Sequence, residues 1–175
     1  MRDLADADHV RRFMRDFGRA CAAPARIYLT GGASAVLMGW RASTIDLDLK
    51  IVSADDSALR ALPRLKEALR LNVELAAPDQ FIPSLPGWET RSAFIADEGR
   101  ASYYHYDFYS QALAKIERSH RLDLEDVRMM TERGLVEAGK LRELFGKIEP
   151  ELFRYPAVDA KAFRASLERF LSRRS

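Results

Sequence analysis

Apolar residues recur along the chain with two different periods, and each change of period marks an expected element. Residues 5–21 place apolar side chains three and four positions apart, with arginines on the other face, which predicts an amphipathic helix. Residues 44–52 alternate instead. Aliphatic side chains occupy the odd positions from 45 to 51 and charged ones the even positions from 46 to 50. A period of two predicts a strand with one buried and one polar face.

The same reading extends over the remaining residues. Strands are expected at 27–30, 72–76, 92–96 and 101–108, and helices at 33–40, 55–71, 110–119 and 122–134. Three prolines and a glycine make 78–91 an irregular loop, and two further helical patterns follow over 135–175. The order predicts an α+β fold, in which a small mixed β-sheet is flanked by helices and followed by a helical C-terminal part. We expect a core over 1–134 and a helical extension over 135–175 packed on the same domain.

Composition excludes several classes of protein. Cys21 is the only cysteine among 175 residues, so no disulfide framework or zinc cluster is expected. The first residues are charged, unlike a signal peptide, and no apolar run approaches the roughly 20 residues of a membrane helix. We therefore expect a cytoplasmic protein without membrane contact. The net charge is only +2, so charge alone does not indicate nucleic-acid binding.

Two aspartates on the expected strand at 44–52 indicate a metal site. Asp46 and Asp48 are two residues apart, so their side chains share one face, about 6.6 Å apart along the strand. Neighbouring carboxylates repel unless a positive charge lies between them, and Mg²⁺ or Mn²⁺ prefers such oxygen ligands together with substrate phosphates. The alternative is an exposed, solvated strand face, although strands are depleted in aspartate.

Two glycines before this strand indicate a phosphate site. Gly31 and Gly32 follow a short apolar strand and precede a helix, whose first N–H groups form a natural anion site. Ser34 adds a hydroxyl in the first turn, and Arg41 lies close before the aspartates. Each feature alone fits an ordinary turn, helix or solvated arginine. Their combination with the Asp-x-Asp pair favours a site for a phosphate group and a divalent metal.

These residues match a known family pattern. GGASAVLMGWRASTIDLDL, residues 31–49, resembles the signature of the nucleotidyltransferase superfamily that includes DNA polymerase beta. In that superfamily a Gly-Gly or Gly-Ser turn holds the nucleoside triphosphate (NTP) and an Asp-x-Asp pair holds the metal. The resemblance therefore implies a nucleotidyltransferase fold, with Gly31, Gly32 and Ser34 on the β- and γ-phosphates.

The resemblance continues downstream. QALAKIERSHRLDLEDV, residues 111–127, is similar to the later motifs of minimal bacterial nucleotidyltransferases of the AbiEii and MenT toxin type, and residues 81–95 and 104–116 resemble a further bacterial subgroup. It implies that Lys115 is a counter-charge for phosphate. It also implies that Asp123 orients Lys115 or assists deprotonation of the nucleophile. The family more often has a basic residue directly before this aspartate, where the chain has Leu122.

Other residues carry weaker expectations. Many superfamily members have a third metal carboxylate, and the candidates are Glu74 and Asp107, each of which also fits a solvated acid at a strand edge. Asp126 is expected at the surface. The aromatic residues over 103–109 are expected in the core, with one of them as a candidate for stacking on a base. Basic residues near the C-terminus fit a solvated helix face or an RNA contact.

The function implied by the resemblance is metal-dependent transfer of a nucleoside monophosphate from an NTP. The acceptor would be RNA such as tRNA, a protein hydroxyl or a small molecule. The toxin-type motifs imply a role in a toxin–antitoxin pair, with an antitoxin protein as partner. Two alternatives stay open: a catalytically silent module of the same fold that binds nucleotide or a partner, and a structural domain without ligand.

Overall fold

The computed structural model describes residues 3–173, which divide into two compact units. Of the described residues, the first unit comprises 3–77 and 92–106, and the second comprises 78–91 and 107–173. These units do not coincide with a boundary after residue 134, because the helices that follow residue 107 pack with those that follow 135. The expected mixed sheet with flanking helices and a helical C-terminal part is confirmed.

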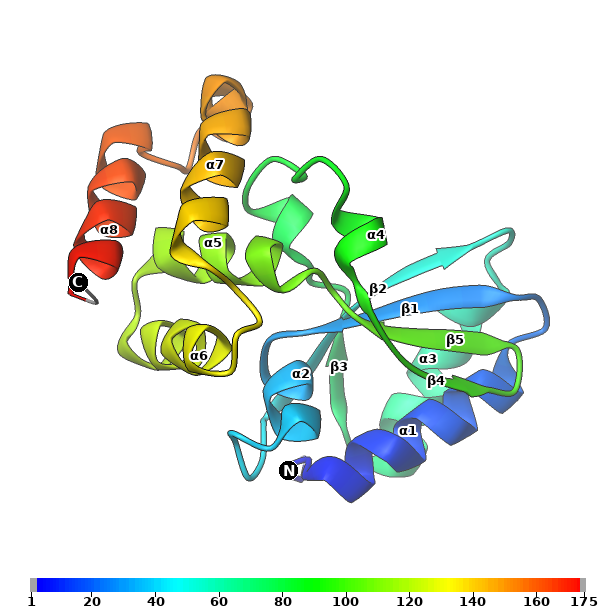
Figure 1. The fold of residues 1–175 in the computed structure, drawn as a ribbon. Coiled ribbons are helices and arrows are strands. Elements are labelled where there is room, and N and C mark those ends of the chain that lie inside the picture. Colours follow the sequence, from blue (N-terminus) through cyan, green and yellow to red (C-terminus); the bar gives the residue numbers. More distant parts are fainter. Residues whose placement is uncertain (1–2, 174–175) are drawn as a thin grey trace. The chain divides into compact units, whose positions relative to one another are not determined.

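A five-stranded sheet forms the centre of the first unit (Figure 1). Its strands are β1 (Ala25–Thr30), β2 (Asp46–Ser53), β3 (Asn72–Glu74), β4 (Ala93–Glu98) and β5 (Ala101–His105), in the order β3-β2-β1-β5-β4. The pairs β1–β5 and β2–β3 are parallel, and β1–β2 and β4–β5 are antiparallel. The sheet is therefore mixed, with β1 at its centre.

Three helices complete the first unit: α1 (Ala7–Ala20), α2 (Gly31–Met38) and α3 (Ser57–Leu69). The helices α1 and α3 pack against one another and against one face of the sheet, where they bury Phe13, Phe17, Leu47 and Leu49. Ile45 was expected on this aliphatic face, but it lies one residue before β2 and is 68% exposed. Alternation predicts a face only within the paired strand, which explains this error.

The helix α1 approaches the turn between β4 and β5 very closely. A Cβ atom on Gly18 would lie 1.9 Å from the carbonyl oxygen of Glu98, and Gly99 in the turn has a φ of +59°. The backbone N–H of Arg100 donates to the carbonyl of Gly18 at 3.1 Å. Only glycine at position 18 permits this backbone contact.

The second unit is helical. Its elements are η1 (Pro78–Gln80), α4 (Trp88–Arg91), α5 (Phe108–Arg118), α6 (Arg121–Glu132), α7 (Ala138–Ile148), η2 (Glu149–Arg154) and α8 (Ala160–Ser172). The helices α6, α7 and α8 each pack on α5, which makes α5 the centre of the unit. Phe145 of α7 and Phe163 of α8 meet edge to face, with ring centroids 4.9 Å apart. No helix within residues 3–173 is long and apolar enough to cross a membrane.

Candidate functional site

Acidic side chains gather on one face of the first unit's sheet. Asp46 pairs in register with Asn72 across β2 and β3, and Asp48 pairs with Glu74. Side chains of paired residues and of residues two apart share a face, so all four belong to the same face. The other face carries the buried Leu47, Leu49 and Val73, and their burial against α1 and α3 fixes which way the carboxylates point.

Asn72 joins two of these acids. Its amide Nδ2 donates to Oδ1 of Asp46 at 2.5 Å and to Oε1 of Glu74 at 2.9 Å. The amide holds two negative groups close together without an opposite charge between them. Sequence analysis missed Asn72, although its position two residues before Glu74 on a strand carries the signal.

The glycine turn lies directly beside Asp48. Gly31 has a φ of +57°, and a Cβ atom there would lie 3.0 Å from Oδ2 of Asp48. The register explains this contact, because Thr30 at the end of β1 pairs with Asp48. A Cβ atom on Gly32 would lie 2.0 Å from Oγ1 of Thr44. Both glycines are therefore required for the chain to turn between β1 and α2 at this place.

The helix α2 begins at this turn. Its N-cap residue, Thr30, makes no side-chain capping bond, and the first turn of the helix holds no acidic residue. The positive end of the helix dipole therefore lies at Gly31, near the carboxylate of Asp48. This end of the first unit therefore places a helix N-terminus beside the carboxylate of Asp48.

Ser34 lies behind this turn, inside the unit. Its side chain is fully buried, and Oγ donates to the carbonyl of Leu29 at 3.0 Å. Nδ1 of His105 lies 3.0 Å from the same oxygen. Because the hydroxyl proton is directed to Leu29, we assign the Nδ1–H tautomer to His105. Burial lowers the pKa of His105 to about 4. The hydroxyl expected to contact a phosphate thus contacts core groups.

Arg41 follows α2 in the loop that leads to β2. The helix ends at Gly39, whose φ is +86°, and the backbone N–H of Arg41 donates to the carbonyl of Ala35 at 3.3 Å. The loop therefore folds back on the end of the helix. Arg41 is half-buried, and its predicted contact with a phosphate stays a prediction.

Lys115 and Asp123 belong to the second unit, where they form a buried charge network. Nζ of Lys115 lies 3.1 Å from Oδ1 of Asp123 and 2.7 Å from Oδ2 of Asp126. Arg118 also contacts Oδ1 of Asp123, at 2.9 Å. Lys115 is only 4% exposed and Asp126 only 2%. The contact expected between Lys115 and Asp123 is present, whereas the expectation that Asp126 lies at the surface was wrong.

Asp107 was considered as a solvated acid at a strand edge, and this was also wrong. It is 1% exposed and caps α5, because its carboxylate accepts the backbone N–H groups of Tyr109 and Ser110. The guanidinium of Arg91 binds the same carboxylate in a bidentate manner, at 3.1 and 2.7 Å. Sequence analysis missed Arg91, which is 16 residues away and lies in the expected loop.

The sequence-predicted residues thus form two local groups. Gly31, Gly32, Ser34, Arg41, Asp46 and Asp48 belong to the first unit, and Lys115 and Asp123 belong to the second. Within the first group, the structure brings together Gly31 and Asp48, while Asp46 lies beside Asn72 on the same face. Within the second group, Lys115 and Asp123 are in contact.

Within residues 3–173, no three His, Cys, Asp or Glu side chains are arranged to hold a metal ion by themselves. The pair Asp46 and Asp48 nevertheless fits Mg²⁺, which commonly takes one or two carboxylates and completes its shell with water and substrate phosphates. No protein-family model matches the chain, and no curated protein or solved structure matches it at a significant level.

Proposed function

We propose that the chain is a metal-dependent nucleotidyltransferase, which moves a nucleoside monophosphate from an NTP to an acceptor hydroxyl. One observation carries the proposal: the Asp48 carboxylate lies against Gly31 at the start of α2, with Asp46 on the same sheet face. A helix N-terminus attracts phosphate, and adjacent carboxylates attract a divalent cation. A nucleoside triphosphate bound to a divalent cation carries both the negative phosphates for the helix N-terminus and the positive ion for the carboxylates.

Asp46 and Asp48 would hold Mg²⁺ or Mn²⁺ in this proposal, and Glu74 lies in register with Asp48 as a third carboxylate. A bound divalent ion would supply neutralisation of charge on the phosphates and on the leaving oxygen. Gly31 and Gly32 let the backbone come close to the β- and γ-phosphates, since neither carries a side chain. Arg41 is proposed as a further phosphate contact.

The chemistry requires positioning and charge neutralisation more than covalent help. The acceptor oxygen forms a bond to the α-phosphorus, and the bond from that phosphorus to the bridging oxygen breaks. Pyrophosphate leaves with the electron pair, and the proton of the acceptor hydroxyl passes to water. Asp123 is proposed as a positioning residue for Lys115, because its Oδ1 is occupied by Lys115 and Arg118.

Lys115 is proposed as a phosphate counter-charge. An ammonium group has three N–H donors, and Asp123 and Asp126 accept two of them. The contact of Lys115 with a phosphate oxygen stays a prediction. The acceptor of the reaction is proposed to be RNA such as tRNA, a protein hydroxyl or a small molecule, and the pairing with an antitoxin belongs to the same proposal.

Transfer of a radiolabelled nucleotide tests this function. The protein is incubated with each α-labelled NTP and Mg²⁺, together with bulk RNA, a protein mixture or small hydroxyl compounds. Asp46→Asn and Asp48→Asn are expected to lower transfer at least 100-fold, because each removes a proposed ligand charge. Asp97→Asn is the matched control, since Asp97 is an exposed strand acid bonded to Ser102. Full transfer by Asp48→Asn would refute the proposal.

A second candidate is a silent binding module of the same architecture. It is favoured by Asn72, which already occupies Asp46 and Glu74 with hydrogen bonds. This candidate predicts an Mg²⁺-dependent rise of the unfolding temperature with NTP, lost in Asp46→Asn, without labelled product on any acceptor. At 100 times its dissociation constant a ligand adds about 2.7 kcal/mol, which thermal unfolding detects.

A further inference from the structure

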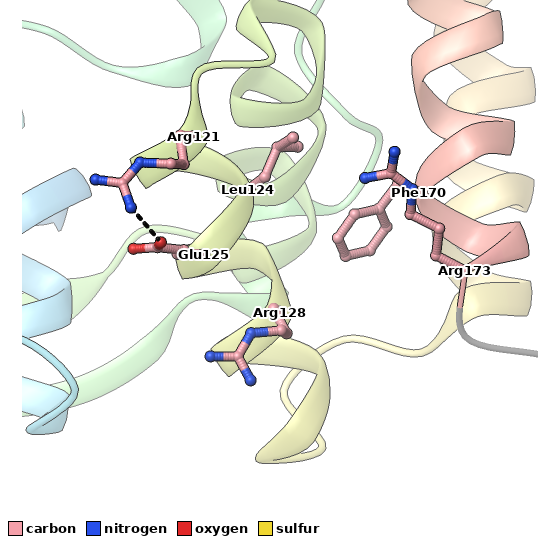
Figure 2. Close-up of a pocket in the computed structure, with 6 residues that line it drawn as sticks. All are labelled: Arg121, Leu124, Glu125, Arg128, Phe170 and Arg173. Atoms are coloured by element: carbon pink, nitrogen blue, oxygen red, sulfur yellow. Dashed lines mark hydrogen bonds and ion pairs between the residues drawn. The ribbon is translucent and has the colours of Figure 1, made fainter.

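A pocket of about 320 Å³ opens between α6 and α8 in the second unit. Both helices pack on α5, and the space between them is lined by Arg121, Leu124, Glu125, Arg128, Phe170 and Arg173. Figure 2 shows Leu124 on α6 directed toward α8, where Phe170 and the guanidinium of Arg173 lie. The centre of the pocket is therefore apolar, and its rim is charged.

Arg173 is the rim arginine whose guanidinium lies beside Phe170, whereas Figure 2 shows the guanidinium groups of Arg121 and Arg128 directed away from α8. Arg121 lies 3.4 Å from Glu125 and Arg128 lies 2.7 Å from Glu132, in exposed pairs one helical turn apart. No ion pair joins Arg173 to another residue within 3–173. Guanidinium groups bind phosphate in a bidentate manner, which makes phosphate the best match for this rim.

The apolar centre of the pocket favours a ligand that carries an apolar or aromatic group in addition to its phosphate. Phe170 presents an aromatic ring that is only half-buried, opposite the aliphatic side chain of Leu124. A planar base stacks on an aromatic ring whatever its identity. The volume lies at the lower end of the usual range for ligand pockets, roughly 300–1,000 Å³, and suits one nucleotide.

We propose that the α6–α8 pocket binds one nucleotide, with its base between Leu124 and Phe170 and its phosphate on Arg173. This site lies wholly in the second unit and contains none of the residues assigned to nucleotidyl transfer. It needs no metal, because the counter-charge is supplied by arginine. The proposal therefore stands independently of the proposed function.

Isothermal titration calorimetry in EDTA tests it, because chelation of Mg²⁺ suppresses binding at the proposed metal site. The ligands are the four ribonucleoside 5′-monophosphates, uridine as a base without phosphate, and ribose 5-phosphate as a phosphate without base. The monophosphates are expected to bind at least tenfold more tightly than uridine or ribose 5-phosphate. Phe170→Leu and Arg173→Glu are each expected to weaken binding about tenfold, since stacking and charge each contribute on that scale.

Two controls separate this pocket from other surfaces. Arg169→Glu changes the same charge on the same helix outside the pocket, and Asp46→Asn changes the proposed transfer site; both should leave the affinity unchanged. A 5′-phosphorylated tetranucleotide distinguishes the source of the ligand. Equal affinity identifies a free nucleotide, and tighter binding that still depends on Phe170 identifies the end of an RNA strand. No binding, or binding that is unchanged in both pocket variants, would overturn the proposal.

Discussion

The buried charge network of the second unit gives the sharpest prediction. Lys115→Met keeps the length of the side chain but removes the positive charge between Asp123 and Asp126. The side chains of Lys115 and Asp126 are 5% and 3% exposed, so water cannot take the place of the ammonium without rearrangement. Arg118 still contacts Asp123, whereas Asp126 loses its ion pair with Lys115.

The magnitude follows from this burial. Removing one partner of a buried ion pair costs about 3–5 kcal/mol, because the other charge stays buried without compensation. In a chain of this length each kcal/mol lowers the unfolding temperature by about 2–4 °C. We therefore expect Lys115→Met to unfold about 6–20 °C below the unmodified protein, by the same rule.

Thermal unfolding followed by circular dichroism measures this shift. Lys140→Met is the matched control, because Lys140 pairs with Glu143 on the surface and is 39% exposed. It should change stability by less than about 0.5 kcal/mol. Adding Asp126→Asn to Lys115→Met should recover part of the loss, since the buried carboxylate that lost its ion pair with Lys115 is then neutral. If Lys115→Met unfolds like Lys140→Met, the network does not stabilise the unit and the reasoning is wrong.

Three further predictions concern the first unit. Because the pKa of His105 is lowered by burial from 6.5 to about 4, the unfolded chain binds this proton first as the pH falls. Stability should therefore fall between about pH 6.5 and 4, by about 2 kcal/mol at pH 5 relative to pH 8. Urea unfolding at the two pH values should show a smaller difference for His105→Gln, and an unchanged one for the exposed His120→Gln. Gly31→Ala and Gly39→Ala both force a side chain to adopt positive φ, at a cost of about 1–2 kcal/mol, but only Gly31→Ala meets Asp48. Equal nucleotide transfer by the two variants would contradict the role of the Gly31 turn. Gly18→Ala would place Cβ 1.9 Å from the carbonyl oxygen of Glu98 and should cost 1 kcal/mol or more, on the order of other overpacking changes. Gly146→Ala, in open space on α7, should stabilise by up to about 1 kcal/mol, and calorimetry of both variants checks the difference in sign.

Local patterns predicted the part of the candidate site that depends on one strand and one turn. The shared face of Asp46 and Asp48 follows from the period of a strand, and the helix after Gly31 and Gly32 follows from a glycine turn before an apolar run. Asn72 escaped prediction because its contact with Asp46 depends on the pairing of β2 with β3, 26 residues away. Pairing of distant strands is not encoded in either segment alone.

Burial of charged residues was the other source of error. Asp107 was considered as a solvated acid and Asp126 was expected at the surface, because isolated charges are rarely buried. Each is instead buried with an opposite charge: Asp126 with Lys115, and Asp107 with Arg91. The contact of Ser34 could not be predicted from local sequence either, because its hydroxyl lies beside His105, which is on a strand 71 residues away.

The division of the chain has a consequence for how it is made. Synthesis proceeds from lower to higher residue numbers, so η1 and α4 emerge before β4 and β5, although they belong to the second unit. The parallel pair β1–β5 cannot form until residue 105 has been synthesised. The ion pair between Arg91 and Asp107 likewise forms only after residue 107 has been added. A nascent chain ending at residue 77 would leave the β1 edge unpaired and open to other strands. Fragments for expression should therefore extend beyond residue 106, and the helical unit cannot be isolated as one continuous piece.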